Sequence, residues 1–300
     1  SSAQISLKTS GEKQFERLIA SSWSREFQVV ILVESNFGFQ SMLRNWILHL
    51  EETEMNNLRN AVIVALDERT QLEVSAETVS VFYDDCKNDS HHFEAQEFRT
   101  EGYNKIVFHK WFITQRALEA GANVILSDTD VVWLKDPVRE ILRDHSTCDI
   151  ALSNDDLLSE GNPTWMNTGF GLFRNTSATR QCIRDFIAWA EKSRETTLHG
   201  FDDQFAWQTF LEKQFTVRSS VKGSPCRQYV GRGITFSIEI LPAKKFMDFR
   251  QWNGTDDSQK SEAFTLHYNW LRNFEMKSVE MKKNGHWLVD PRAVYEKRSR

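Results

Sequence analysis

The sequence predicts a single α/β domain in which helices flank a central, mostly parallel sheet. Apolar runs rich in β-branched residues alternate with helical patterns four times between residues 27 and 126. Such alternation is typical of a doubly wound sheet built from right-handed strand–helix–strand units. The chain has 300 residues, of which 40% are hydrophobic, so it can bury both faces of such a sheet.

The first half of the chain supplies the regular part of the predicted sheet. The run "FQVVILVES" at 27–35 has the continuous apolar pattern of a strand buried on both faces. A helix is predicted next, from apolar residues at helical spacing: Met42, Leu43, Trp46, Ile47 and Leu50. Further strands are predicted at 60–66, 79–83 and 123–126. A polar loop at 84–101 leads into a helix at 103–120, which Gly121 ends.

The second half of the chain has a less regular pattern. Strands are predicted at 148–153, 168–174 and 264–271, and helices at 176–193 and 202–213. No linker rich in proline or glycine divides the chain, and it contains no internal repeat. We therefore predict one domain at 27–292, preceded by a stem or lead-in segment at 1–26 and followed by a tail at 293–300.

Charge and hydropathy narrow the choice of partners. A net charge of −5 and a pI of about 6.0 disfavour a broad surface for nucleic acid or for an anionic membrane. No run of 18 or more apolar residues is present, so any N-terminal membrane anchor is expected to lie outside this chain.

Cysteines and glycosylation sequons bear on the compartment. The four cysteines lack C-x-x-C spacing and could form two disulfides in any of three alternative pairings. They are Cys86, Cys148, Cys182 and Cys226. Sequons for N-glycosylation begin at Asn88, Asn175 and Asn253. Together with the abrupt start of the chain, the sequons favour a secreted or luminal domain.

The segment "NVILSDTDVVWLKDP" at 123–137 places two carboxylates, Asp128 and Asp130, directly after the fourth predicted strand. Charged residues are rarely buried unless they are paired or hold a metal. Ligands of a doubly wound sheet gather at the carboxyl ends of its strands, where these aspartates lie. Oxygen ligands two residues apart suit Mg²⁺ or Mn²⁺. We therefore predict a divalent-metal site here rather than an ordinary turn.

Two reaction classes use this arrangement. One is glycosyl transfer from a nucleotide sugar, in which the metal assists departure of the diphosphate. The other is a haloacid-dehalogenase-type phosphatase, in which Asp128 is a covalent nucleophile. The phosphatase motif follows the first strand of its domain, whereas three strand–helix units precede Asp128, which favours the transferase. A non-catalytic module that binds nucleotide sugars or glycans is a third alternative.

The same segment resembles the core signature of the eukaryotic nucleotide-diphospho-sugar transferases, which include plant cell-wall xylosyl- and arabinosyltransferases. Further agreement, in the family's order over about residues 27–290, comes from "ESNFGFQSMLRNWILHL", "WMNTGFGLFRNT", "HGFDDQFAWQTF" and "FTLHYNWLRNFEMKSVEMKKNGHW". The chain departs from the family in one place, since many relatives have glycine after the C-terminal histidine where this chain has "LRNFEMK".

The resemblance implies a GT-A (Rossmann-like) fold and a retaining glycosyltransferase that depends on Mn²⁺, with Mg²⁺ as the alternative. The donor would be a UDP-sugar of the galactose, xylose or arabinose class, and the acceptor a hydroxyl of a glycan or glycoprotein. Family members are mostly type II Golgi proteins, so the resemblance implies a Golgi-luminal domain; cytosolic relatives leave the cytoplasm as the alternative.

Carried over residue by residue, the resemblance assigns a set of donor-binding positions. The base and ribose would meet Ser35, Asn36 and Phe37, which an ordinary strand-to-helix turn explains equally well. The metal and diphosphate would meet Asp128, Thr129 and Asp130. The donor sugar would meet Asn167, Thr168 and Gly169, unless these form a simple turn. The anomeric face would meet Asp202, Asp203 and Gln204, of which one acid is explained by helix capping.

Three basic side chains complete the predicted site. Lys110 lies on an apolar helical face, where a lysine either extends to water or points into the donor pocket as a cation. His267 alone is typical of a core histidine, but the family places a C-terminal histidine on the metal, and two aspartates leave a divalent ion underfilled. Lys277 is suited to neutralise the diphosphate as a point charge.

Overall fold

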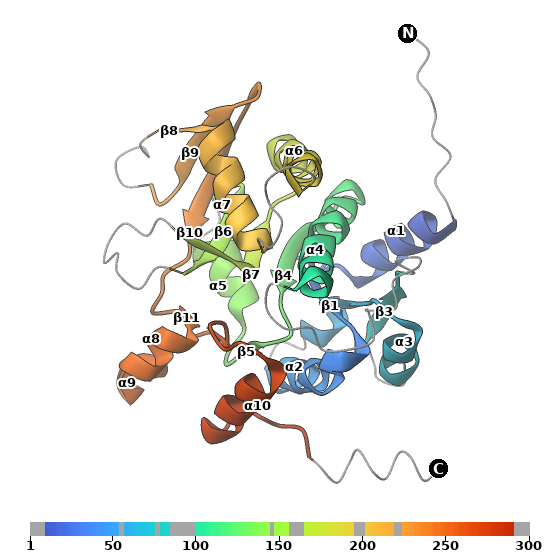
Figure 1. The fold of residues 1–300 in the computed structure, drawn as a ribbon, viewed down its shortest axis with the longest axis vertical. Coiled ribbons are helices and arrows are strands. Elements are labelled where there is room, and N and C mark those ends of the chain that lie inside the picture. The colour runs from blue at the N-terminus through green and yellow to red at the C-terminus, as the bar shows by residue number, and fades with distance from the viewer. Residues whose placement is uncertain are drawn as a thin grey trace.

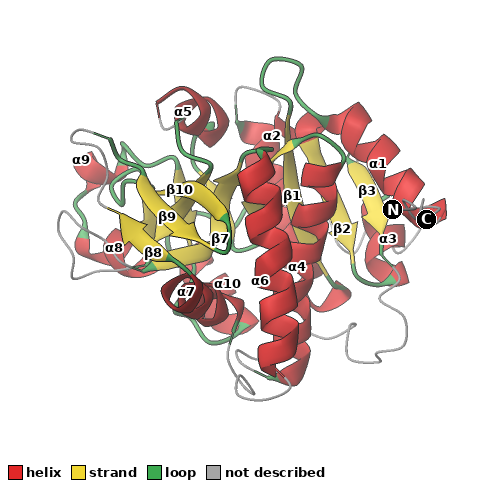
Figure 2. Cartoon of the chain, turned by 90° about the horizontal axis from the view of Figure 1, so that it is seen from above, coloured by secondary structure: helices red, strands yellow, loops and turns green. Residues whose placement is uncertain are grey.

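A computed structural model describes residues 10–53, 57–75, 79–84, 100–144, 147–155, 165–194, 202–218 and 224–290. Within these ranges a nine-stranded sheet lies between two layers of helices (Figures 1 and 2). The predicted α/β class is confirmed.

The large sheet has the strand order β3-β2-β1-β4-β7-β6-β10-β9-β8. Its parallel block consists of β1 (Val29–Ser35), β2 (Ala61–Ala65), β3 (Ser80–Tyr83) and β4 (Asn123–Ser127). Its other strands are β6 (Ile150–Asn154), β7 (Met166–Phe173), β8 (Thr216–Arg218), β9 (Arg227–Gly231) and β10 (Ile234–Ile240). Only β7 and β9 run against the direction of the rest, so β1, β4 and β6 end at the same edge.

Helices cover both faces because β1 is apolar on both. Val30 and Leu32 face one core cluster, and Val29 and Ile31 face the other. The first cluster is covered by α1 (Ser10–Ser22), α4 (Glu101–Glu119), α6 (Ser177–Arg194) and α7 (Asp203–Gln214). The second is covered by α2 (Gln40–Glu52), α3 (Glu68–Val74) and α5 (Pro137–Asp144), with short 3-10 turns at Phe37–Phe39 and Asn57–Asn60.

A second, three-stranded sheet joins the segment after β4 to the C-terminal part of the chain. Its order is β11 (Phe246–Asp248), β12 (Thr265–His267) and β5 (Val131–Trp133). β12 and β5 are antiparallel, with His267 paired to Val131. The helices α8 (Phe249–Gly254), α9 (Asp257–Lys260) and α10 (Phe274–Lys283) surround it. This pairing brings His267 beside the D-x-D motif.

Most predicted elements are present with ends shifted by a few residues, and two differ. Helix α1 lies inside the predicted lead-in segment and buries Phe15 and Ile19 completely, so at least that part packs on the sheet. The strand predicted at 264–271 ends at His267, because its pairing with β11 and β5 ends there; Trp270 beyond it has a left-handed backbone with φ of +64°. The limits at 27 and 292 stay predictions, and the tail at 293–300 lies outside the described residues.

Cys148 and Cys226 form a disulfide that links the start of β6 to the segment before β9. Cys182 is a buried free thiol in α6, and Cys86 lies outside the described residues.

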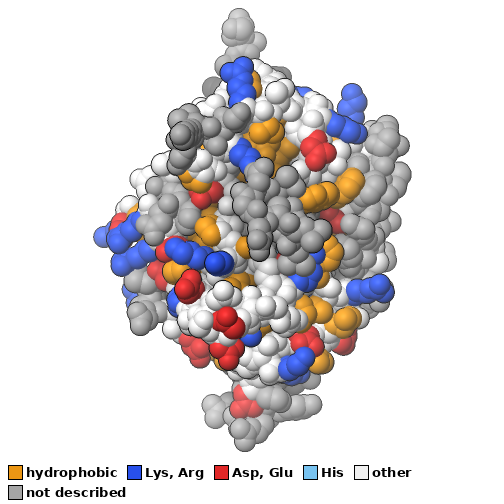
Figure 3. All heavy atoms as spheres, turned by 90° about the vertical axis from the view of Figure 1, so that its left-hand side faces the viewer, with side chains coloured by type: hydrophobic (Ala, Val, Ile, Leu, Met, Phe, Trp, Pro, Cys, Tyr) orange, Lys and Arg blue, Asp and Glu red, His pale blue; other side chains and the backbone are white. Residues whose placement is uncertain are grey.

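Among the helices of the described part, none is long and apolar enough to span a membrane. On the face shown in Figure 3, basic and acidic side chains are interspersed.

The residues after α10 dock onto α2. The carbonyl of His286 accepts a hydrogen bond from Asn45 Nδ2 at 2.9 Å and lies 2.9 Å from His49 Nε2. The backbone N–H of Leu288 donates to Asn45 Oδ1 at 2.7 Å, and the Tyr268 hydroxyl lies 2.8 Å from His286 Nδ1. These contacts anchor α10, which carries Lys277.

This docking predicts a dependence of stability on pH. Burial, reinforced by the charge of His49, lowers the pKa of His286 to about 4. The unfolded state, with a pKa of about 6.5, then binds more protons than the folded state between these values. Stability contributed by the neutral ring is therefore complete above pH 6.5 and is lost as the pH falls toward 4, by on the order of 2 kcal/mol after allowance for partial exposure.

Urea unfolding at pH 7.5 and pH 5 measures this effect when wild type is compared with His286→Gln. The comparison is needed because His267, whose pKa is raised, contributes stability of the opposite pH dependence. The variant should lose less stability between the two pH values than wild type does. Equal losses would show that His286 does not carry the effect.

Candidate active site

The carboxyl end of β4 and the turn after it carry Asp128 and Asp130. The backbone N–H of Asp128 donates to the carbonyl of Gly169 in β7 at 2.7 Å, and the N–H of Val131 donates to the carbonyl of Asp128 at 3.2 Å. The carbonyl of Asp130 accepts from the N–H of Tyr268 at 3.0 Å. Backbone hydrogen bonds therefore position both aspartates.

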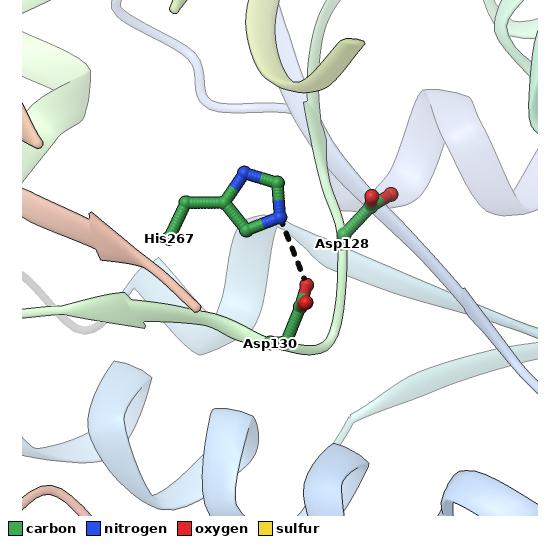
Figure 4. A group of neighbouring side chains, drawn as sticks. All are labelled: Asp128, Asp130 and His267. Atoms are coloured by element: carbon green, nitrogen blue, oxygen red, sulfur yellow. Dashed lines mark ion pairs between the residues drawn. The ribbon is translucent and has the colours of Figure 1, made fainter. Parts of the chain in front are cut away.

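Asp128, Asp130 and His267 together form a candidate metal site (Figure 4). One ligand atom from each lies within 4.8 Å of the others. His267 is buried, and its Nε2 atom lies 3.2 Å from Asp130 Oδ1. Its Nδ1 atom is buried without a hydrogen-bond partner among the described residues. Two carboxylates and an imidazole that converge in this way are a donor set for a divalent cation.

Gly169 lies against this cluster, and the space beside its backbone is already filled. A Cβ atom added there would lie 2.3 Å from His267 Cε1 and 2.7 Å from Asp128 Oδ2. Both distances are too short for non-bonded atoms, so a larger residue would displace the imidazole or the carboxylate. The glycine is therefore required by the packing of two candidate ligands.

Two lysines bring positive charge to the same carboxylates. The Nζ atom of Lys110, from α4, lies 3.3 Å from Asp128 Oδ1 and 3.2 Å from Asp203 Oδ2. Lys110 is only 3% exposed, so of the two orientations that the sequence left open it takes the inward one. The Nζ atom of Lys277, from α10, lies 2.5 Å from Asp130 Oδ2.

The pKa values of the cluster follow from these contacts. Burial raises the pKa of Asp130, but Lys277 and His267 outweigh burial and bring that pKa well below its usual range. Burial lowers the pKa of His267, and Asp130 outweighs it, so the imidazole pKa is raised. At Asp128 burial dominates and raises the pKa to about 6, although Lys110 opposes the shift. Of the two aspartates in the D-x-D motif, Asp128 is thus the one whose charge is less compensated; its side chain is also 34% exposed, and both features suit a bound cation.

The start of α7 carries the residues predicted to meet the anomeric face: Asp202, Asp203 and Gln204. Asp202 caps the helix by accepting from the N–H of Phe205 at 2.8 Å. Asp203 Oδ2 accepts instead from Trp111 Nε1 at 3.0 Å and Thr168 Oγ1 at 2.8 Å, in addition to its contact with Lys110. One acid is therefore explained by capping, as predicted, and the other is held by three donors.

These side chains line one cavity of about 840 Å³. Every residue that the sequence assigned to the donor, the metal or catalysis lines it, with the exception of Phe37. The guanidinium of Arg69 lies 3.4 Å from the centroid of the Phe37 ring, and the N–H of Phe37 donates to Asp67 Oδ2 at 2.7 Å. The Phe37 side chain packs there instead of lining the cavity.

Asp155 follows β6, and sequence reasoning missed two of the residues around it, Arg250 and Asn269. Asp155 Oδ1 accepts from Asn269 Nδ2 and Trp270 Nε1, each at 2.9 Å, and Oδ2 accepts from Gln204 Nε2 at 2.6 Å. The guanidinium of Arg250 donates to the Asp155 carbonyl at 2.9 Å. An acid directly after a strand is a signal for a site residue, but nothing local marks Arg250 or Asn269. Other cavity residues that were not singled out include Glu34, Phe39, Met42, Tyr103 and Leu271.

Fold and site together define a class of protein. A sheet whose carboxyl edge carries clustered carboxylates, a histidine and buried lysines around a large cavity is typical of proteins that bind phosphorylated ligands with a metal. The sequence pattern of the nucleotide-diphospho-sugar transferases matches residues 56–281. The chain belongs to this family, which confirms the resemblance.

Three curated relatives are similar over much of this chain. The beta-arabinofuranosyltransferase RAY1 of Arabidopsis thaliana is 22% identical over 270 residues, which cover 88% of this chain and 48% of that protein. The UDP-galactose:fucoside alpha-3-galactosyltransferase of Dictyostelium discoideum is 23% identical, covering 61% and 31%. The Arabidopsis thaliana arabinosyltransferase XEG113 is 23% identical, covering 73% and 33%. The chain spans about half the length of these relatives or less.

Solved structures agree on the fold. The glycosyltransferase GlyE of Streptococcus pneumoniae superposes with a TM-score of 0.50 at 13% identity, over 87% of this chain and 60% of that one. The bifunctional glycosyltransferase WbbM does so with a TM-score of 0.50 at 11% identity, over 82% and 46%. The predicted GT-A fold is confirmed.

The crowding at Gly169 predicts the effect of one added methyl group. Gly169→Ala should weaken Mn²⁺ binding about tenfold or more, because the Cβ displaces His267 or Asp128 from the cluster. Isothermal titration with Mn²⁺ measures the change. The matched control is Gly254→Ala, where a Cβ would meet no atom within 4 Å. Equal Mn²⁺ affinity in the two variants would contradict the assignment.

Proposed function

We propose that the protein is a metal-dependent, retaining glycosyltransferase that moves a sugar from a UDP-sugar of the galactose, xylose or arabinose class to a hydroxyl of a glycan or glycoprotein. The observation that carries this proposal is the meeting of Asp128, Asp130 and His267 with buried Lys110 and with Lys277 at one cavity. Family membership and the named relatives support it.

Asp128, Asp130 and His267 would hold the divalent cation, for which we propose Mn²⁺, with Mg²⁺ as the alternative. The fit rests on the converging donor set, on the undercompensated charge of Asp128 and on the close packing at Gly169. When bound, such a cation acts as a Lewis acid toward a diphosphate leaving group.

The remaining residues of the cavity are assigned to the donor. Ser35 and Asn36, at the carboxyl end of β1, would face the nucleoside, and Lys277 would supply a point charge to the diphosphate. Thr129 lies between Asp128 and Asp130 and lines the same cavity. The donor sugar would lie between Asn167–Gly169 and the start of α7.

The proposed reaction exchanges one bond at the anomeric carbon. The acceptor hydroxyl oxygen bonds to that carbon as its bond to the phosphate oxygen breaks, and the hydroxyl proton passes to the departing phosphate. Retention requires attack on the face from which the phosphate leaves, so no separate base is needed. Asp203, fixed by Lys110, Trp111 and Thr168, would place its negative charge beside the positive charge that develops at this carbon.

The family and the topology disfavour the phosphatase alternative, since Asp128 follows β4 in the interior of the sheet rather than the first strand of the chain. A binding module without catalysis remains the competing hypothesis.

For the compartment we propose the Golgi lumen, with an anchor outside this chain. The Cys148–Cys226 disulfide supports an oxidising compartment over the cytoplasm.

The proposal is tested by incubating the protein with UDP-galactose, UDP-xylose or UDP-arabinose, with Mn²⁺ or with EDTA. Mn²⁺-dependent release of UDP supports the transferase, and an anomeric-proton NMR spectrum of the product reports retention. Binding without turnover supports the module, and cleavage of simple phosphomonoesters supports the phosphatase.

His267→Ala should weaken Mn²⁺ and UDP binding together, whereas Lys277→Ala should weaken UDP binding and leave the metal requirement unchanged. If His267→Ala unfolds the chain and its folded fraction keeps wild-type Mn²⁺ affinity, the histidine is a core residue.

Asp203→Asn is expected to lower kcat about a hundredfold while the KM for the donor changes less than about threefold, because the lost charge acts mainly in the transition state. Steady-state kinetics with the preferred UDP-sugar measure both constants, and urea unfolding checks that the variant is folded. A raised KM with an unchanged kcat would assign Asp203 to donor binding instead.

A further inference from the structure

The cavity extends across several strands of the sheet. Ser35 lies at the carboxyl end of β1, and Asp155 directly follows β6, three positions away in the strand order. Asp128, directly after β4, and Asn167, in β7, lie between them. A donor bound between Ser35 and the D-x-D motif, as proposed above, would leave the end at Asp155 for a second substrate.

Trp270 lies at that end and is unusually exposed for its size. It lines the cavity and is 59% exposed, while most large aromatic residues of the chain are buried. Trp165 also lines the cavity there and is 39% exposed; its ring centroid lies 6.4 Å from that of Phe205. Exposed aromatic faces at a cavity are a feature of binding sites.

The Trp270 ring is held in place along one edge and on one face. Its Nε1 donates to Asp155 Oδ1 at 2.9 Å, and the guanidinium carbon of Arg250 lies 3.8 Å from the ring centroid. Arg250 is itself fixed by Asp248 Oδ2 at 2.9 Å and by the carbonyl of Asp155 at 2.9 Å. The indole is therefore ordered before any ligand binds, which reduces the entropy lost on binding.

The backbone conformation of Trp270 also indicates a binding role for its side chain. Its φ of +64° lies in the left-handed region, which glycine adopts without strain and a bulky residue does not. Side chains held in such conformations concentrate at binding and catalytic sites. A glycine would adopt this backbone with less strain, so a tryptophan here indicates a role for the indole itself.

We propose that Trp270, held by Asp155 and Arg250, is the platform on which a sugar ring of the acceptor stacks. The apolar C–H face of a sugar ring matches an aromatic face, and the indole face not covered by Arg250 can receive it. Gln204 links Asp155 to the start of α7, beside Asp203, so a ring on this platform lies next to the proposed site of transfer. The inference rests on the proposed function for the position of the donor.

The chemistry of this end favours a sugar over a peptide. The two oxygens of Asp155 already accept from Gln204, Asn269 and Trp270, so its acceptor positions are used within the protein and the surface offered to a ligand is the aromatic face. A peptide in extended conformation is usually bound along an open sheet edge or a groove. A single fixed indole is better suited to one ring.

The test compares Trp270→Gly, Trp270→Phe and the surface variant Leu72→Ala, whose residue is exposed on α3 away from the cavity. The protein is loaded with UDP and Mn²⁺. Binding of methyl glycosides and disaccharides of galactose, arabinose, xylose and fucose is then measured by saturation-transfer NMR and titration, beside an unglycosylated peptide that carries serine hydroxyls. The Kd for UDP is measured in parallel, and acceptor KM values are measured with the preferred donor.

Trp270→Gly, which fits the backbone, should weaken sugar binding and raise the acceptor KM about tenfold or more, with a smaller change in the Kd for UDP. Trp270→Phe, which keeps a ring, should fall between Gly and wild type, and Leu72→Ala should bind sugars as wild type does. Unchanged sugar binding in Trp270→Gly, or binding of the peptide alone, would overturn the platform. Absence of UDP-sugar turnover in a wild type that binds sugars through Trp270 would refute the proposed function and leave the platform standing.

Discussion

The structure depends on how negative charge is accommodated at the carboxyl end of β4. Asp128, Asp130 and Asp203 lie within reach of one another in a largely buried setting, which is unfavourable unless positive charge is supplied. Lys110 and Lys277 supply part of it, from α4 and α10. Helices from distant parts of the sequence thus meet at this edge, where Lys110 pairs with Asp128 and Asp203 and Lys277 pairs with Asp130.

Strand pairing sets the geometry of this charge cluster. β5 continues directly from the D-x-D turn and pairs with β12, so that His267 lies opposite Val131. On the other side, β7 pairs with β4 and presents Gly169, the residue that leaves room for the imidazole. Because neighbouring residues of a strand face opposite sides, a slip of one residue in β12 would turn His267 away from both aspartates.

The parts of the fold that the sequence predicts are those encoded by local periodicity. β1, β4 and α4 follow from continuous or helical apolar patterns, and the D-x-D motif indicates the candidate site because it interrupts such a pattern. Long-range pairing decides the rest. The reversed direction of β7 and the end of β12 at His267 depend on partners far away in the chain. The inward orientation of Lys110 likewise depends on Asp203, which comes from a distant helix.

The separation along the chain between Asp130 and Lys277 has a consequence for biosynthesis. The two residues are 147 positions apart, and a ribosome adds roughly 5 to 20 residues per second, so about 7 to 30 seconds pass between their syntheses. During that interval the nascent chain can form the parallel block β3-β2-β1-β4, while Asp130 stays hydrated because Lys277 has not yet been synthesised. The site is therefore assembled late in translation, and a chain that stalls before α10 presents an open acidic sheet edge to the cell's quality-control machinery.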